Sequence, residues 1–359
     1  MTAVTETKSV AGAVRRPPML LVLVILALLL VMVSLVSMTV GAAGIPLPRV
    51  LAVLGIGGGD PAVVARDEVI LWSIRFPRVI LAGLVGALLA VSGTIMQGLF
   101  RNPLADPALV GVSSGAALAA AVTIVLSDRY VVAHLGSIPF EILPFAAFFG
   151  ALVTTTLLYR IATRHSRTSI AIFLLGGIAI AALTGAGIGL LVFMADDRQL
   201  RDITFWMLGS LGGATWSKVF TLLPFLIAAI PVSVLISRGL DLLALGESEA
   251  FHSGIAVERL KRVSIVLIAA ATGAAVSVSG VIGFVGIVVP HLLRLVVGPS
   301  HRLLLPATML LGACLMMAAD SAARIIAAPA EVPIGIITAL IGAPFFLYLL
   351  LRQRSLVSL

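Results

Sequence analysis

The sequence predicts an all-α polytopic membrane protein with about ten transmembrane helices, some of them short, re-entrant or broken. Only 11% of its 359 residues are charged and 60% are hydrophobic, whereas about a quarter of the residues in a soluble domain carry a charge. Long segments recur without any Asp, Glu, Lys, Arg or His, namely residues 19–48, 79–100, 168–195, 263–290 and 332–351. Each could cross a hydrocarbon core about 30 Å thick, which takes a helix of about 20 apolar residues.

The remaining charges exclude other classes of protein. A net charge of +8 would suit a nucleic-acid partner if the basic residues formed one patch, but they fall in short segments between apolar runs. Lys and Arg in such loops set the orientation of membrane helices. Cys314 is the single cysteine and lies inside an apolar run, so no intramolecular disulfide is possible and no redox or metal chemistry is indicated.

The first span is predicted to be a retained helix. Lys8, Arg15 and Arg16 precede the apolar stretch Met19–Val40, as in a signal peptide, but the stretch exceeds the 7–15 residues of a signal-peptide core. The later spans follow the apolar runs and end near loops that contain basic residues, glycine or proline. The predicted spans cover residues 19–42, 76–99, 107–127, 142–160, 169–194, 216–237, 263–281, 284–297, 303–325 and 334–351.

The seventh and eighth spans depend on a break within residues 263–297. The segment is too long for one crossing and too short for two full ones. It contains Gly280, Gly283, Gly286 and Pro290, which favour a helix, a tight break and a short second helix. A membrane tolerates such a break where neighbouring protein covers the backbone.

Ten spans also agree with the distribution of positive charge. They place both termini and most of the 24 Lys and Arg residues in the cytoplasm, as the positive-inside rule requires. We therefore expect a cytoplasmic tail over residues 1–18, one transmembrane domain over 19–352 with a cytoplasmic loop at 238–262, and a cytoplasmic tail over 353–359.

No catalytic motif accompanies these helices. The sequence has no Gly-x-x-x-x-Gly-Lys-Ser/Thr, so the chain is not expected to hydrolyse ATP itself in the P-loop manner. It has no His-Glu-x-x-His, and its five histidines are scattered without the spacing of metal ligands. An integral-membrane enzyme is therefore not indicated, because the sequence shows no arrangement of a nucleophile, a base or a metal cluster that could carry out a reaction.

Two polar segments lie between or within spans. Residues 101–107 join two spans with two prolines, and Asn102 and Asp106 could cap the helix that follows. Asp320 and Arg324 have the i,i+4 spacing of an ion pair on a helix, with Glu331 beyond them. Charges inside a membrane are often functional, but a purely structural pair is equally compatible with the spacing.

The longest cytoplasmic loop, residues 238–262, has an amphipathic helical pattern. Its apolar residues could form two short helices hinged at Gly246 and Gly254. Such a surface would suit a cytoplasmic protein partner. The alternative is an interfacial helix that lies on lipid headgroups.

A series of motifs, in order along residues 20–352, resembles the FecCD, or type II, permeases of ABC importers for iron chelates, haem and cobalamin. The motifs are Arg75-Phe-Pro-Arg78, Ser92-Gly-Thr-Ile-Met-Gln97, Asn102-Pro-Leu-Ala-Asp-Pro107, Trp206-Met-Leu-Gly-Ser-Leu211, the Leu245-Gly-Glu loop, Gly280-Val-Ile-Gly-Phe-Val-Gly286 with Pro290, His291 and Arg294, Asp320, Arg324, Glu331-Val-Pro-Ile-Gly335 and Gly342-Ala-Pro-Phe.

The resemblance implies the type II ABC importer permease fold in a bacterial cytoplasmic (inner) membrane. It implies a homodimer of ten-helix subunits around a central pathway, with two cytoplasmic ATP-binding subunits below and an extracytoplasmic substrate-binding protein above. Membrane lipid surrounds the dimer, and no nucleic acid, cofactor or resident metal is expected.

The resemblance also assigns roles to residues. It assigns binding-protein docking to Arg75, Arg78 and Arg324. It assigns ATPase coupling to Leu245, Gly246, Glu247, Ala250 and Gly254. It assigns the translocation pathway or its inner gate to Gln97, Asn102, Ser166, Thr168, Ser169 and Arg201.

Residues 98–107, 111–117 and 202–213 look most like the haem-importer branch of that family. Haem carries two propionates, and Arg201 or Arg198 near the outer mouth would suit them. A ferric siderophore and cobalamin are the alternative substrates. A protein of another class, a stand-alone secondary transporter driven by an ion gradient through Asp320 and Arg324, is the remaining alternative.

Overall fold

The computed structural model describes residues 18–41, 44–58, 60–107, 111–126, 142–164 and 167–357, and almost all of them are helical. The elements are α1 (Met19–Thr39), α2 (Leu47–Val53), α3 (Pro61–Ile70), a π-helical turn η1 (Leu71–Arg75), α4 (Phe76–Phe100), α5 (Val112–Leu126), α7 (Ile142–Ala162), β1 (Thr163–Arg164), β2 (Arg167–Thr168), α8 (Ile170–Met194), α9 (Asp197–Leu208), α10 (Trp216–Leu245), α11 (Glu247–His252), α12 (Val257–Ser279), α13 (Val285–Val297), α14 (His301–Ile326) and α15 (Ile334–Val357).

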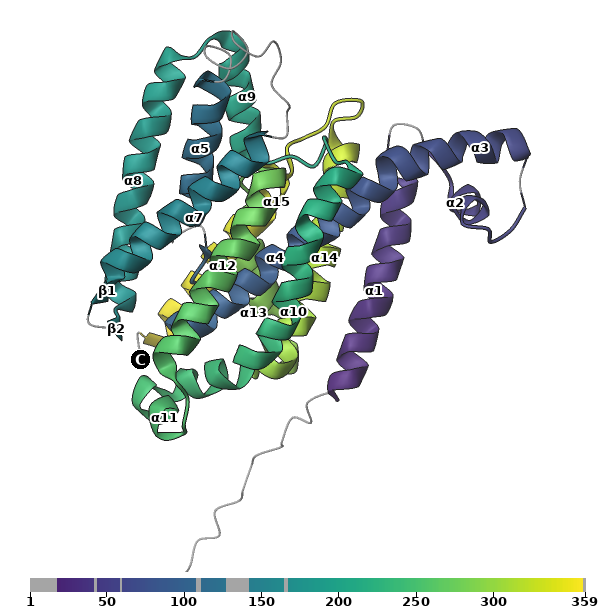
Figure 1. Cartoon of the computed structure of the whole chain (residues 1–359). Helices are drawn as coiled ribbons and strands as arrows, with labels where there is room; N and C mark the ends of the chain where they lie inside the picture. The colour runs from purple at the N-terminus through teal and green to yellow at the C-terminus, as the bar shows by residue number, and fades with distance from the viewer. Residues whose placement is uncertain are drawn as a thin grey trace, which may run out of the picture.

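Helix α4 runs through the middle of the molecule and is buried along almost its whole length (Figure 1). It packs against α10, α12, α13 and α14. Gly86 faces the backbone of Gly312, and Gly93 faces that of Gly286, so closely that neither glycine has room for a Cβ. Small residues allow helices to pack this tightly in lipid, where no hydrophobic effect drives helix association.

Other helices flank this central group. Helices α5, α7 and α8 pack together on one side, and α1 packs along α14 on the other (Figure 1). Helices α1 and α8 expose large apolar side chains, such as Leu28, Leu183 and Phe193. Exposed apolar surface of this extent suits contact with lipid or with another membrane subunit.

The described helices confirm the prediction of about ten spans. Seven are long and apolar enough to cross a membrane, and three shorter apolar helices cover Val112–Leu126, Val285–Val297 and Ile334–Tyr348. The seven include one continuous helical segment, Pro61–Phe100, which joins α3, η1 and α4. The second predicted span, which was expected to begin at Phe76, therefore continues an earlier helix.

Pro77 explains this difference. Proline has no N–H and its ring collides with the carbonyl of residue i−4, so it predicts a helix start. Here the π-helical turn at Leu71–Arg75 comes immediately before it, and such a turn shifts the hydrogen-bond pattern without ending the helix.

The loop after α4 also differs from expectation. Arg101 ends α4 in the left-handed conformation, with φ of 50°, and the Asn102 Oδ1 accepts a hydrogen bond from the Leu104 N–H at 2.9 Å. Asn102 therefore stabilises a turn and does not cap α5, which begins ten residues later at Val112. The predicted start of this span at residue 107 was too early, since α5 begins at Val112; Pro103 disfavours a helical conformation at Asn102.

The predicted break between the seventh and eighth spans is confirmed. Helix α12 ends at Ser279 and α13 begins at Val285. The Ser279 carbonyl accepts a hydrogen bond from the Ser210 N–H at 2.8 Å, and Gly280 packs against the Trp206 carbonyl. Neighbouring protein therefore covers the broken backbone, as a membrane location requires.

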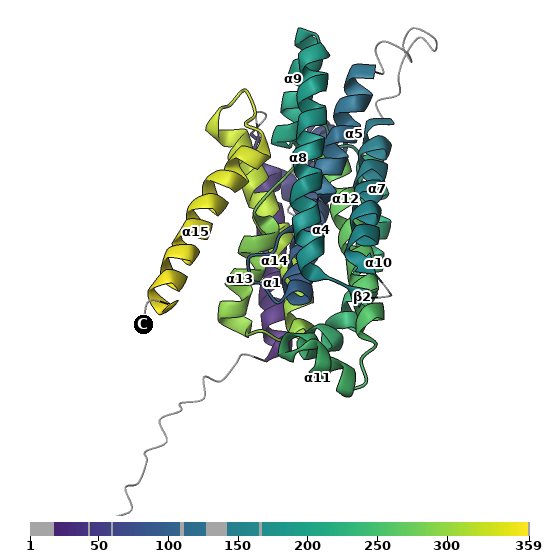
Figure 2. The ribbon, with the colours of Figure 1, turned by 90° about the vertical axis from the view of Figure 1, so that its left-hand side faces the viewer.

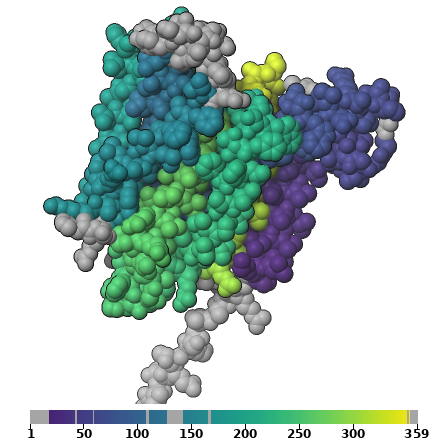
Figure 3. Space-filling view, viewed as in Figure 1, coloured from purple at the N-terminus to yellow at the C-terminus, as the bar shows by residue number. Residues whose placement is uncertain are grey.

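Several short elements had no counterpart among the predicted spans. Helices α2 and α3 project from the body of the molecule (Figure 3). Helix α9 begins with a capping box, in which Asp196 accepts from the Gln199 N–H and the Gln199 side chain accepts from the Asp196 N–H. These helices lack a long apolar run, which was the pattern that defined the spans.

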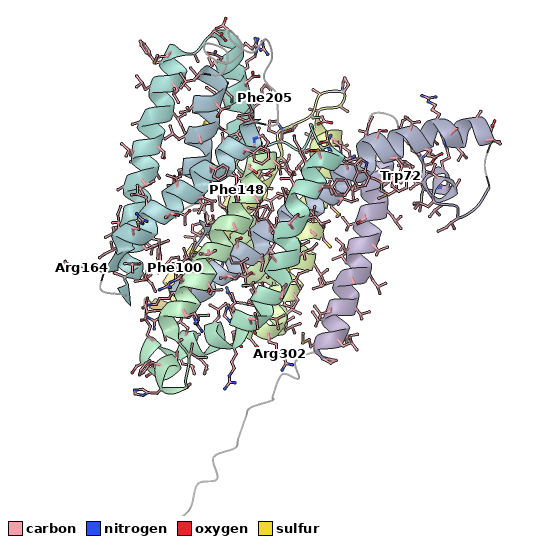
Figure 4. The ribbon with its side chains drawn as sticks, viewed as in Figure 1. Trp72, Phe100, Phe148, Arg164, Phe205 and Arg302 are labelled. Atoms are coloured by element: carbon pink, nitrogen blue, oxygen red, sulfur yellow. The ribbon has the colours of Figure 1, made fainter. Side chains whose placement is uncertain are left out.

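The two ends of the molecule differ in character. Helix α11 lies at one end, toward which the first residues of α1 and the last residues of α15 also point (Figure 2). Arg164 and Arg302 lie at the same end (Figure 4). At the opposite end the rings of Trp72 and Trp216 stack with centroids 6.3 Å apart, as aromatic side chains do at a membrane–water interface.

Candidate functional site

The segment after α10 forms a compact helical turn that presents apolar side chains. Helix α10 continues to Leu245, and Gly246 then turns the chain into α11 with φ of 144°. Leu245 is 72% exposed and Phe251 is 69% exposed. Two large apolar side chains at the same end of the molecule as Arg164 and Arg302 form a surface that a protein partner could cover.

The structure corrects two expectations about this segment. The first of the two predicted short helices is the end of α10, so only α11 is separate. Ala250 is fully buried; its methyl group holds α11 against the rest of the chain and does not face a partner. Phe251 was missed because the sequence pattern does not show which side of a six-residue helix faces outward.

A buried lysine connects α11 with the β1–β2 hairpin. The Lys261 Nζ lies 2.9 Å from the Glu247 Oε2 and 3.1 Å from the Glu258 Oε1. It also donates to the backbone carbonyl of Thr168 at 3.3 Å. Three elements therefore meet at one ammonium group, and no local sequence pattern marks Lys261 for this role.

Two of the predicted gate residues lie beside this lysine. The N–H and the hydroxyl of Thr168 both lie 3.2 Å from the Glu258 Oε2. Ser169 caps α8 through a hydrogen bond from the Ile172 N–H, and its own N–H donates to the Ala162 carbonyl. Ser166, the third predicted gate residue, lies outside the described residues.

A second charged cluster lies at the opposite end of the molecule. Arg78 donates from Nη2 to the Asp320 Oδ1 at 2.9 Å and from Nη1 to the Glu331 Oε1 at 2.7 Å. The Arg324 Nε lies 3.1 Å from the Asp320 Oδ2, so the i,i+4 ion pair expected from the sequence is confirmed. Two arginines and two acids form a neutral group that joins α4, α14 and the loop before α15.

The same cluster holds the end of α1. Arg324 donates to the carbonyl oxygens of Val40 and Ser37, and Arg75 donates to the Met38 carbonyl. The three arginines predicted to dock a binding protein are thus buried against their own chain. Among the acids of the cluster Glu331 is the accessible one, with 43% of its side chain exposed. Hydrogen bonds from Arg78 lower the pKa of Glu331, so this carboxylate is ionised at neutral pH.

Of the residues predicted to line the pathway, Gln97 and Asn102 lie together at the end of α4, where the Asn102 N–H donates to the Gln97 carbonyl at 3.1 Å, and Arg201 lies apart from them. Gln97 is buried between α4 and α13, where it donates to the Gly286 carbonyl and accepts from Arg294; it joins two helices and does not face an open path. Asn102 lies in the turn after α4. Arg201 lies on the exposed side of α9, at the opposite end from α11.

Two cavities adjoin the broken-helix region. One, of about 520 Å³, lies between α9, residues 281–284 and α15. The other, of about 570 Å³, lies between α7, α10 and α12 and is lined in part by Phe148, which is labelled in Figure 4. Both have mainly apolar walls, and within the described residues no cluster of three or more His, Cys, Asp or Glu could hold a metal ion.

The match to a known family accounts for this combination of features. Residues 27–352 match the model of the FecCD transport family. The chain belongs to the FecCD transport family. It is 44% identical over 326 residues to the hemin transport system permease protein HmuU of Yersinia pestis, covering 85% of this chain and 94% of HmuU. It is 43% identical to the cobalamin import system permease protein BtuC of Halobacterium salinarum, covering 90% of this chain and 84% of BtuC.

A solved structure supports the same assignment. The chain superposes with a TM-score of 0.79, at 33% identity, on an ABC transporter assigned to the metal-chelate type in an inward-facing conformation. The alignment covers 92% of this chain and 99% of the other. FecCD membership makes this protein the permease of an ABC importer, and so decides against the stand-alone secondary transporter that the sequence had left open.

Proposed function

We propose that this FecCD permease forms the membrane pathway for haem. The observation that carries the proposal is the 44% identity to a hemin transport permease over nearly all of that protein. The exposed Arg198 and Arg201 on α9 support it, because guanidinium groups form strong charge-assisted hydrogen bonds with carboxylates such as the haem propionates.

Cobalamin is the second candidate substrate. The identity to the cobalamin permease BtuC is 43%, only slightly lower than the identity to HmuU. A ferric siderophore is the third candidate, because the solved neighbour is assigned to the metal-chelate type of ABC transporter.

Growth of a strain that lacks this gene tests the substrate. Under iron starvation we expect the strain to fail on haem as the only iron source and to grow on ferric siderophore, and the wild-type gene should restore growth on haem. Loss on the siderophore alone would rule out haem. Growth on both iron sources, with loss of cobalamin-dependent growth, would favour cobalamin.

We propose that two copies of the permease assemble with two ATP-binding subunits and an extracytoplasmic binding protein in a bacterial inner membrane. The basic Arg164 and Arg302 at the α11 end support a cytoplasmic location for that end and for both termini. ATP hydrolysis would occur on the separate subunits. The mass of the purified complex checks this stoichiometry.

The exposed surface at α11 is the proposed ATPase contact. Leu245 and Phe251 would enter the partner, while Gly246, Glu247 and Gly254 set the shape of the turn. Glycine is required at residue 246 because its φ is 144°, a conformation that other residues adopt only with strain. Thr168 at the end of the hairpin and Ser169 at the start of α8 belong to the proposed inner gate, to which the family resemblance also assigns Ser166.

The ionic cluster at the other end is the proposed docking site of the binding protein. Arg75, Arg78 and Arg324 would attract its acidic surface, with Glu331 as an internal competitor for Arg78. Replacing Arg78 or Arg324 by glutamate would place a second acid beside the buried Asp320. Such a variant would destabilise the fold, so a loss of binding could not be attributed to docking.

Glu331→Gln gives a cleaner test of docking. Removing this half-exposed carboxylate should strengthen binding of the acidic partner about twofold to fivefold, the range of one partly exposed ion pair, and should make binding more sensitive to salt. Glu68→Gln on α3 makes the same charge change away from the cluster and should have little effect. An affinity of both variants that does not respond to salt would show that docking does not use these charges.

A further inference from the structure

We propose that Lys261 is a positioning residue that joins the ATPase contact at α11 to the gate hairpin. This inference rests on the proposed function, because it takes the exposed end of α11 as the contact with the ATPase. It adds a route by which movement there would reach the hairpin.

The contacts of Lys261 use its full bonding capacity. A lysine ammonium has three donors and no acceptor. Glu247 of α11, Glu258 of α12 and the Thr168 carbonyl of β2 supply three acceptors within 3.3 Å. The lysine side chain is only 3% exposed, so loss of any one acceptor leaves a buried donor unsatisfied.

Glu258 makes a second connection to the hairpin. Its Oε1 accepts from Lys261, while its Oε2 accepts from the N–H and the hydroxyl of Thr168. The Thr168 hydroxyl also lies 3.0 Å from the Thr163 hydroxyl across the hairpin. Both strands are therefore attached to α12 through a single acid–base pair.

The two helices that Lys261 connects differ in how firmly they are held. Helix α12 is mostly buried and packs against α4, α7 and α10, so it provides a fixed support. Helix α11 has six residues and lies between two left-handed glycines, Gly246 and Gly254. A force on Phe251 would therefore move α11, and with it Glu247, more readily than α12.

Displacement of Glu247 would change the acceptors left to the ammonium. Lys261 would then bind Glu258 and the Thr168 carbonyl more strongly or would follow Glu247 away from them. Either response alters how firmly the hairpin is held. This coupling needs no long chain of residues, since the buried ammonium group of Lys261 contacts both α11 and the hairpin directly.

The test separates positioning from simple support by measuring transport per ATP hydrolysed. In the complete transporter reconstituted in vesicles, Lys261→Met should lower substrate transported per ATP about tenfold while the ATPase subunits remain bound. Lys261→Arg keeps the charge and should restore part of the ratio. Arg262→Met, at the neighbouring exposed position, is the matched control and should leave the ratio unchanged.

Glu247→Gln is the second variant, for the case in which Lys261→Met does not fold. It weakens only the α11 contact and leaves Lys261 paired with Glu258, so the protein should assemble and still show a reduced ratio. A wild-type ratio in Glu247→Gln or Lys261→Met, or a parallel fall of transport and ATP hydrolysis, would overturn the role of Lys261. Failure of the ATPase contact itself would appear differently, as normal uptake by a variant with a charge at Leu245.

Discussion

Replacing Leu245 by aspartate is expected to abolish uptake while the permease still reaches the membrane at its normal level. The side chain is 72% exposed at the end of α10, so the change should not disturb the packing of the chain itself. A central apolar anchor of an interface contributes about 2 kcal/mol or more, which is about thirtyfold in affinity. A buried unpaired carboxylate in its place would cost further.

Copurification of the ATPase subunits and uptake in vesicles measure this effect. Leu245→Met keeps an apolar side chain of similar volume and should retain both properties. Leu245→Asp is a better probe than a change at Gly246, whose backbone conformation requires glycine. Normal copurification and uptake with Leu245→Asp would show that the ATPase does not bind at α11.

Replacing Asp320 by alanine is expected to destabilise the folded permease by about 3–5 kcal/mol, the cost of removing one partner from a buried ion pair. Asp320 is buried and contacts both Arg78 and Arg324. Without it, two arginines would share the half-exposed Glu331, and the cluster would carry a net positive charge. Arg324 also holds the end of α1, so α1 should loosen as well.

The free energy of unfolding in detergent micelles measures this loss. Asp320→Asn keeps an oxygen acceptor for the arginines and should lose less stability than Asp320→Ala. Asp197→Ala removes an exposed acid from the first turn of α9 and should change stability by only about 0.3–1 kcal/mol. Equal stability of Asp320→Ala and the wild type would show that the cluster is dispensable for the fold.

Only some contacts of the ionic cluster around Asp320 could be predicted from local sequence patterns. Asp320 and Arg324 are one helical turn apart, so their spacing alone predicted the pair that the structure contains. Arg78 lies 242 residues from Asp320 along the chain, and nothing in the sequence near either residue points to the other. The motif resemblance named the three arginines together but did not show that they face their own chain.

Local sequence patterns were equally limited for residues 238–262, at the α11 end of the molecule. The amphipathic pattern and the glycines of residues 238–262 predicted short helices with a hinge, and Gly246 does divide α10 from α11. Whether a side chain of this segment faces inward depends on packing, so Ala250 proved to be buried and Phe251 exposed. Lys261 could not be singled out because its partner Thr168 is 93 residues away.

By itself the sequence determined the class of protein and the approximate positions of its spans, because every apolar run that crosses a membrane must satisfy its backbone locally as a helix. It also determined the break at Gly280 and the pairing of Asp320 with Arg324, which depend on neighbours a few residues apart. Only the tertiary structure decided the partners of Arg78 and Lys261. Those contacts depend on how helices distant in the sequence pack, and a buried charge stays in place only where several elements supply its acceptors together.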